Sequence, residues 1–380
     1  MKVLFCGDLY PGGDFENCDP RGAVTAPVFH AADFRVATLE TALSDRSERA
    51  DKSVLTCSSA GAAAVRDMGL HAVSLAQNHI QDMGPHGILD TIQHLDAAGI
   101  LHTGAGKTIA EAIRPAWIGD GLCILAFCRY RALTLNQIAV ADEESPGVAI
   151  LTAERVRSAL DQLPPGARAI LVFHWGCEHL WLTPYDNIEL ARELLADERV
   201  ALIIGSHPHR VQGYIEHVGK RAYFSLGNFL FSNFYLDAPC IQVSPSTPPA
   251  KPPTTRFYHP VHRLTHKRWL LVNRISMVVT YNTETGKAQH QFLMQRDARP
   301  EVTAAPAWVR LTFGLWVRAL AVVSTHLPKT LYQPLFATHH RVTFWILQKR
   351  ILLTRVRNRG LAGIWAKLRA RLHSSAHSQP

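Results

Sequence analysis

The sequence predicts an α/β fold in which helices cover a largely parallel β-sheet. A basic helical extension is predicted to follow it. Between residue 1 and about residue 235, short apolar runs typical of buried strands alternate with segments of helical periodicity. Most of these apolar runs end on an acid, an amide or a histidine. Residues 300–380 lack the alternation and are helical and basic in character. These three observations define a main domain and a distinct tail.

Six apolar runs predict strands with a polar side chain at the end, and a seventh run, CILAFC, has none. The six runs are KVLFCG, RVATL, AVSLAQ, AILVFHW, ALIIGSH and AYFSLG, and their polar residues are Asp8, Glu40, Asn78 with His79, His174, His207 with His209, and Asn228. Loops at the carboxyl ends of parallel strands converge on one crevice, so we expect these residues to meet there. Carboxylate, carboxamide oxygen and imidazole are ligands of hard or borderline metals, so the pattern predicts a metal site.

The remaining elements follow from periodicity and composition. Helices are predicted around Ile88, Ile92 and Leu95, ending at Gly99, and around Val156, Leu160 and Leu163. Residues 237–268 are proline-rich and predict an irregular insertion, and residues 269–295 predict a hairpin with its turn at 282–286. We therefore expect a main domain over residues 1–299 and a helical tail over residues 300–380.

The net charge of +9 is concentrated in the tail. Residues 300–380 carry 12 lysines and arginines and one acid, whereas residues 1–299 carry 28 basic and 30 acidic residues. The apolar face of the tail contains Leu361, Ile364, Trp365, Leu368 and Leu372. A basic amphipathic helix with tryptophan predicts docking on an anionic membrane surface, and the alternative is a terminal helix packed on its own domain. The apolar stretch 311–327, interrupted by Arg318, is predicted to be too short to span a bilayer.

Two further expectations concern the cellular context. The seven cysteines form no C-x-x-C pair, and their odd number predicts reduced thiols. The chain enters a strand at Lys2 without the pattern of a signal peptide, so we expect a cytoplasmic location, with peripheral association at the inner membrane face. No nucleic-acid partner is predicted.

Several longer motifs share an order with one known family. They are GD at 7–8, TLET at 38–41, SLAQNHIQDMGPHGILDTIQHLDAAGI at 74–100, GAG at 104–106, HWGCE at 174–178, GSHPHRVQ at 205–212 and FSLGNFLF at 224–231. Over about residues 1–295 the chain resembles the calcineurin-like metallophosphoesterases, and more closely the CapA family of capsule synthesis, also called poly-γ-glutamate synthesis proteins. This resemblance implies a calcineurin-like four-layer α/β sandwich, here with a C-terminal helical extension.

The resemblance also implies roles for individual residues. The implied ligands of one or two divalent ions (Mn, Zn or Fe) are Asp8, Glu40, Asn78, His174, His207 and His209. Glu40 is implied to bridge the two ions, and His207 and His209 to divide between them. His79 resembles the histidine that assists the leaving group, with Asp82 as its orienting partner. One departure matters, because Tyr10 stands where the wider superfamily has a metal-binding histidine.

Three functions therefore remain open from the sequence. The first is a metal-dependent hydrolase of capsule biosynthesis, acting on a phosphoester or on an amide of an anionic polymer. The second is a non-catalytic accessory protein that contains metal and binds the polyanion during capsule synthesis or export. The third is a membrane-peripheral scaffold. The His79–Asp82 pair favours turnover, whereas Tyr10 argues against a complete two-ion centre.

Overall fold

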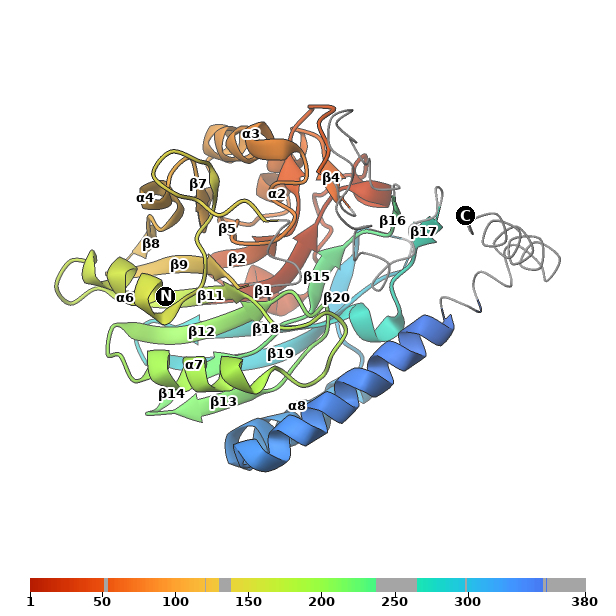
Figure 1. Cartoon of the computed structure of the whole chain (residues 1–380). Helices are drawn as coiled ribbons and strands as arrows, with labels where there is room; N and C mark the ends of the chain where they lie inside the picture. Colours follow the sequence, from red (N-terminus) through yellow and green to blue (C-terminus); the bar gives the residue numbers. More distant parts are fainter. Residues whose placement is uncertain are drawn as a thin grey trace, which may run out of the picture.

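Two mixed sheets face each other, and helices lie outside them (Figure 1). The computed structural model describes residues 1–50, 54–119, 121–129, 138–236, 265–297, 299–350 and 353. The eight-stranded sheet has the order β20-β19-β18-β1-β2-β5-β6, with β15 pairing with β1 as well. The six-stranded sheet has the order β13-β14-β12-β11-β9-β8.

The eight-stranded sheet contains the first half of the predicted strands. Its members are β1 (Lys2–Tyr10), β2 (Phe34–Leu39), β5 (Ala72–Ser74), β6 (Leu101–Thr103), β15 (Asn228–Phe231), β18 (Ile275–Asn282), β19 (Lys287–Gln295) and β20 (Val302–Ala304). Strands β15, β1, β2, β5 and β6 pair in parallel, so their carboxyl ends lie at one edge of the sheet. The antiparallel hairpin of β18 and β19 confirms the predicted hairpin over residues 269–295.

The six-stranded sheet contains the predicted strands from the middle of the chain. Its members are β8 (Ala116–Gly119), β9 (Leu122–Cys128), β11 (Arg168–His174), β12 (Val200–Ser206), β13 (Tyr214–His217) and β14 (Lys220–Tyr223). Strands β9, β11, β12 and β14 pair in parallel. Three two-stranded sheets complete the described strands: β3 (Ala42–Leu43) with β4 (Thr56–Cys57), β7 (Ala105–Gly106) with β10 (Gly147–Val148), and β16 (Phe234–Leu236) with β17 (Thr265–Lys267).

Helices form the outer layers, as expected for an α/β sandwich. They are α1 (Pro27–His30), α2 (Gly61–Asp67), α3 (Gly84–Ala98), α4 (Ile109–Ala112), α6 (Ala153–Asp161), α7 (Tyr185–Leu195) and α8 (Ala307–His326), with 3-10 turns η1 (Gly13–Phe15) and η3 (Leu271–Asn273). Both predicted helices are confirmed, although α6 ends at Asp161, before Leu163. Gly99 ends α3 with a φ of 72°, a left-handed conformation that glycine adopts without a steric penalty.

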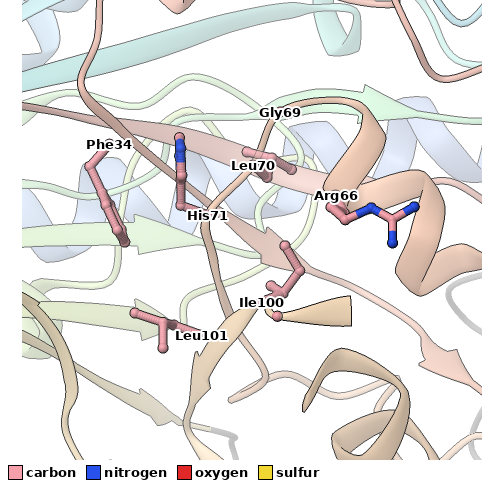
Figure 2. A pocket seen from close by; sticks show the side chains of 8 residues that line it. Phe34, Arg66, Gly69, Leu70, His71, Ile100 and Leu101 are labelled. Carbon is pink, nitrogen blue, oxygen red and sulfur yellow. The ribbon is translucent and has the colours of Figure 1, made fainter. Parts of the chain in front are cut away.

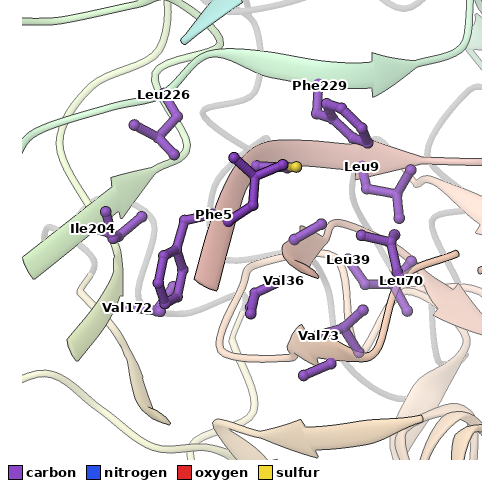
Figure 3. Packing of buried hydrophobic residues seen from close by; sticks show 14 of the residues in the cluster. Phe5, Leu9, Val36, Leu39, Leu70, Val73, Val172, Ile204, Leu226 and Phe229 are labelled. Carbon is purple, nitrogen blue, oxygen red and sulfur yellow. The ribbon is translucent and has the colours of Figure 1, made fainter. Parts of the chain in front are cut away.

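The core lies mainly between the two sheets. Figure 3 shows Phe5, Val36 and Val73 of the eight-stranded sheet packed near Val172 and Ile204 of the six-stranded sheet. All seven residues of β9 are buried, because this strand has apolar layers on both sides. The second core cluster joins α6 and α7 to the other face of the six-stranded sheet. The predicted four-layer sandwich is therefore confirmed.

One predicted strand is wrong in a way that shapes the site. The run AYFSLG does not form one strand, because β14 ends at Tyr223 and residues 224–227 connect it to β15, which begins at Asn228. Between them Gly227 adopts a φ of 71°, and the chain crosses from the six-stranded to the eight-stranded sheet. The crossing places Asn228 opposite Asp8 in the pairing of β1 with β15. Asn228 therefore begins a strand where the sequence pattern placed it after one.

The chain after residue 300 packs on the main body over its first part. Strand β20 pairs with β19, and Val309 and Val317 of α8 are fully buried against the core. A second helix follows at residues 329–350. The predicted domain boundary near residue 300 stays a prediction, although residues 302–326 share the core of the body. The predicted apolar face at residues 361–372 lies outside the described residues, as do residues 237–264 of the predicted insertion.

The prediction about bilayer length is wrong. Helix α8 has 20 residues and is long and apolar enough to cross a membrane, judged by length and composition alone. About a third of that window is buried inside the protein, where α8 contacts β13 and β19.

Candidate metal centre

Polar side chains from both sheets meet at the carboxyl ends of their parallel strands. Asp8 comes from β1 and Glu40 follows β2, while His174 ends β11 and the pair His207 and His209 follows β12. All five side chains are buried. Asn78, in the loop after β5, joins them through its Oδ1 atom, which lies 2.9 Å from His174 Nε2. The structure thus brings together the six residues that the sequence analysis proposed as ligands.

The buried side chains form two groups that share one carboxylate. Glu40, His174 and His207 form the first group, and Asp8, Glu40 and His209 form the second. Within each group the potential ligand atoms all lie within 4.8 Å of one another. Glu40 Oε1 lies 3.5 Å from His209 Nε2 and 4.0 Å from His174 Nε2. The position of Glu40 between the groups is the geometry expected of a bridging ligand.

The Glu40 carboxylate supplies a test of whether metal fits here. Both of its oxygens are buried, and neither accepts a hydrogen bond from any residue that the structure describes. Burial raises the pKa of Glu40 well above its usual value, although His209 acts in the opposite direction. Burying a carboxylate without hydrogen-bond donors destabilises the folded protein, and a bound divalent cation would offset this cost. The donor set of nitrogen and oxygen atoms therefore fits a metal centre.

Two imidazoles are held with one nitrogen toward Glu40. His174 Nδ1 lies 3.0 Å from the Ser206 hydroxyl, which donates to the Phe173 carbonyl at 3.3 Å. The Ser206 oxygen is therefore placed to accept a proton from Nδ1, which leaves the lone pair of Nε2 directed to the centre. Metal-binding histidines commonly have such a partner on the second ring nitrogen.

His209 is oriented in the same way by an amide. Its Nδ1 atom lies 2.8 Å from Asn228 Oδ1 and 3.5 Å from Asp8 Oδ2, so Nε2 faces Glu40. Burial alone would lower the pKa of His209, but the neighbouring carboxylates of Glu40 and Asp8 raise it to about 9. The sequence pattern predicted that Asn228 would lie at the crevice but assigned it no role, and it assigned none to Ser206. Only the spatial arrangement identifies their orienting roles.

The backbone around the centre is strained. Four described residues other than glycine have positive φ, and three of them are His179 (63°), His207 (96°) and His209 (52°). Such conformations cost about 1–3 kcal/mol each and concentrate at functional sites. At His207 the strained backbone turns its N–H toward Asp8, where both carboxylate oxygens lie 3.3 Å away. The loop after β12 thus both presents an imidazole and holds a carboxylate.

His79 and Asp82 form the predicted pair beside this centre. His79 Nδ1 lies 2.5 Å from Asp82 Oδ2, and the Asp82 side chain is fully buried. The same Asp82 oxygen accepts the Leu55 backbone N–H at 2.6 Å. Gln77 fixes the loop from the other side, because its Oε1 accepts the His79 N–H and its Nε2 donates to the Thr41 carbonyl.

Tyr10 contributes no ligand in this arrangement. Its hydroxyl donates to the Thr56 carbonyl at 2.9 Å. Its ring packs against Phe231 and Phe234, with centroid separations of 5.3 and 5.6 Å. Among the acidic, histidine and cysteine side chains that the structure describes, this group therefore consists of Asp8, Glu40 and His209, and Tyr10 adds no ligand to it.

A lysine near the centre was missed by sequence reasoning. Lys267 ends β17, and its Nζ lies 4.3 Å from the centroid of the Trp269 ring. That ring in turn lies 5.1 Å from the His209 ring. Burial lowers the pKa of Lys267, while Glu178 and Glu40 favour its charged form. No motif marks Lys267, because it lies at the end of a stretch that predicts irregular structure.

A surface hollow elsewhere on the molecule lacks the carboxylates of the candidate metal centre. It lies at the amino ends of β2, β5 and β6, opposite the metal centre, and Figure 2 shows Phe34, His71 and Leu101 among its lining residues. The His71 ring stacks on Phe34 at 5.0 Å and contacts the Arg35 guanidinium at 3.2 Å. No acidic residue lines the hollow. We therefore assign the candidate site to the carboxyl ends of the strands.

In sequence, the chain is similar to proteins that are named for capsule or polyglutamate synthesis. The chain is 27% identical over 191 residues to the capsule biosynthesis protein CapA of Bacillus anthracis, covering 48% of this chain and 46% of that protein. It is 23% identical over 250 residues to the PGA biosynthesis protein CapA of Bacillus subtilis (strain 168), covering 61% and 63%. A probable polyglutamine synthesis accessory protein of Mycobacterium tuberculosis is 27% identical over 169 residues, covering 42% and 44%. The matches thus span less than two thirds of each relative.

One solved structure also aligns with the chain. The crystal structure of TT1561 of Thermus thermophilus covers 78% of this chain and 99% of its own, with a TM-score of 0.36 and 10% identity. That likeness is too low to carry a conclusion.

The family model described as "Bacterial capsule synthesis protein PGA_cap" matches residues 2–233, which include every residue of the two ligand groups. The chain therefore belongs to the PGA_cap family of bacterial capsule synthesis proteins.

Proposed function

We propose that this protein acts in capsule synthesis as a metal-dependent hydrolase. Its substrate is either a phosphoester or the amide bond of an anionic polymer. The observation that carries the proposal is the buried Glu40 carboxylate, which lies between two ligand groups without a hydrogen-bond donor in the described chain. Family membership and the names of the relatives support poly-γ-glutamate as the polymer context.

The residues at hand would hold one or two divalent ions. Asp8, Glu40 and His209 would bind the first ion, and Glu40, Asn78, His174 and His207 the second. Mixed imidazole and oxygen ligands suit Mn, Zn or Fe. Since Tyr10 donates elsewhere, the first ion has fewer protein ligands and should be the more weakly held of the two.

The chain's own groups have separate roles in the proposed reaction. Divalent ions, when bound, would lower the pKa of water and stabilise negative charge on the oxygens of the reacting group. His79 Nε2 donates a proton to the leaving group, because Nδ1 is committed to Asp82. The buried Asp82 side chain keeps the imidazole in this orientation. The ammonium group of Lys267 adds a positive charge that favours an anionic substrate.

A second function, polymer binding without turnover, is favoured by Tyr10. Its hydroxyl points to the Thr56 carbonyl, so one ion site lacks a ligand that the wider superfamily has. The Mycobacterium tuberculosis relative is named as an accessory protein. In this alternative the metal centre and Lys267 hold the polyanion, and His79 transfers no proton.

Metal analysis combined with a substrate panel distinguishes the two functions. Purified full-length protein is analysed for Mn, Zn and Fe by mass spectrometry, then incubated with γ-glutamyl oligomers and a small phosphodiester. We expect bound metal and hydrolysis of at least one substrate class, both lost in Glu40→Gln and both retained in the exposed control Glu198→Gln. Bound metal with polymer binding but no turnover would favour the accessory function, and equal metal in wild type and Glu40→Gln would refute the site.

A further inference from the structure

The exposed apolar side chains of this protein are concentrated on its last two described helices. Most of the large hydrophobic residues that face solvent lie between residues 308 and 353. They are Trp308, Leu311, Leu315, Trp316, Val322, Leu331, Leu335, Val342, Trp345, Ile346 and Leu353. An exposed apolar surface of this kind indicates an interaction site. We call these residues the outer face.

On α8 the outer face is a stripe along one side of the helix. Trp308, Leu311, Leu315 and Val322 follow helical spacing, and Leu311 and Leu315 are 66% and 60% exposed. The opposite side of α8 packs on the body, where Val309 and Val317 are fully buried. The helix is therefore apolar on both sides, and only its inner side is covered by the described part of the chain.

The second helix repeats this arrangement. Leu331, Leu335, Val342 and Ile346 lie on one side, beside Trp345, which is 60% exposed. The inner side is anchored, because the buried Tyr332 donates its hydroxyl to the Thr183 carbonyl at 2.8 Å. His339 Nε2 accepts the Trp181 N–H at 3.0 Å. In the part of the chain that the structure describes, these contacts fix the second helix to the body by its inner side.

The charged side chains of these two helices are all positive. Arg310, Arg318, Arg341 and Lys349 are exposed on them. The sequence has no aspartate or glutamate after Glu301. A second copy of this chain would bring like charges together on this face, so self-association through it is electrostatically opposed. An anionic lipid surface complements both the charge and the apolar stripe.

We propose that the outer face docks on a membrane surface that contains anionic lipid. Two exposed tryptophans, Trp308 and Trp345, enter the boundary between headgroups and acyl chains, where the amphipathic indole ring is favoured. Leucine side chains of the stripe are buried beside them, and the arginines and lysine contact the phosphate groups. Helix α8 lies along the surface, because its inner side remains packed on β13 and β19.

Binding to vesicles tests this proposal with the full-length protein. Cosedimentation is measured with phosphatidylcholine vesicles and with vesicles that contain about 30% phosphatidylglycerol, in low and in high salt. We expect binding to the anionic vesicles only, with a loss in high salt because screening acts within about 10 Å at 0.1 M. The double variant Leu311→Gln/Leu315→Gln should bind at least about tenfold more weakly, since each leucine contributes apolar burial.

Control variants distinguish a specific contribution of the outer face to vesicle binding from the general effect of losing an exposed apolar side chain. Trp117→Gln removes an exposed apolar side chain from β8, away from α8, and should bind like wild type. Arg318→Gln/Arg341→Gln should weaken binding to anionic vesicles and reduce its salt dependence. Wild-type binding by Leu311→Gln/Leu315→Gln, or equal weakening in Trp117→Gln, would overturn the proposal. So would lipid-independent dimers that the double variant abolishes, since a protein partner would then occupy the face.

Discussion

His79 Nδ1 lies 2.5 Å from the carboxylate of Asp82, and that carboxylate also accepts the Leu55 backbone N–H at 2.6 Å. The side chain of Asp82 is completely buried. A carboxylate oxygen that accepts from both groups fixes the proton of His79 on Nδ1. The pair therefore orients the imidazole of His79, and Nε2 is the ring nitrogen that this carboxylate does not hold.

This pair should act in turnover and not in metal binding. If the protein hydrolyses a substrate of the panel, His79→Ala should lower kcat on the order of 10²–10⁴-fold, because the leaving group loses its proton donor. Bound metal, measured by mass spectrometry, should remain at the wild-type level. Loss of metal in His79→Ala would show that His79 is a ligand.

Asp82 should act through His79 as a positioning residue. Asp82→Asn keeps the shape of the side chain but removes the negative charge that holds the imidazole, so kcat should fall while KM changes little. The pH profile of kcat should shift in the same variant, which a purely structural role would not cause. An unchanged pH profile together with an equal fall in stability and activity would contradict this role.

Glu40→Gln should make the metal-free protein more stable. The substitution removes a carboxyl group whose charged form is disfavoured by burial and which has no hydrogen-bond donor in the described structure. Tm of chelator-treated protein should rise, whereas added Mn or Zn should no longer raise it further. Chelator-treated Glu198→Gln is the matched control and should keep the wild-type response. A metal-free Glu40→Gln protein less stable than wild type would contradict the interpretation.

Tyr10→Phe should leave metal binding unchanged and lower stability. The hydroxyl donates to the Thr56 carbonyl, so its removal costs about 1 kcal/mol and touches no ligand. Denaturant unfolding and metal analysis of the same preparation check both statements. A fall in bound metal would mean that the Tyr10 hydroxyl is a ligand.

Gly7→Ala should destabilise the fold strongly. A Cβ atom at Gly7 would lie 1.8 Å from the Gly227 carbonyl oxygen, at the crossing between the sheets. The backbone must move to accommodate it, and we expect a loss of more than about 2 kcal/mol in urea unfolding. Gly314→Ala is the control, because its Cβ would meet only Phe292 at 4.0 Å, and alanine in a helix should be neutral or stabilising. Wild-type stability of Gly7→Ala would contradict the close packing.

The sequence predicted the main features of the fold for identifiable reasons. Strands such as β9 and β11 are nearly continuous apolar runs, and α3 ends at a glycine in the left-handed conformation. These signals depend only on residues close together in the chain, so they can be recognised in the sequence alone. The crossing from one sheet to the other within AYFSLG could not be predicted, because it involves the turn at Gly227, which lies against Gly7 of a distant strand.

The sequence by itself identified the residues that meet at the candidate site. Asp8, Glu40 and His174 stand at the ends of apolar runs, and parallel pairing brings such ends to one edge. Only the tertiary structure decided how these groups face one another. The shared position of Glu40, the orientation of His209 by Asn228 and the nearness of Lys267 depend on contacts between segments far apart in the chain. Periodicity reports the side of an element that is buried, whereas the partner of each side chain is set by packing between elements.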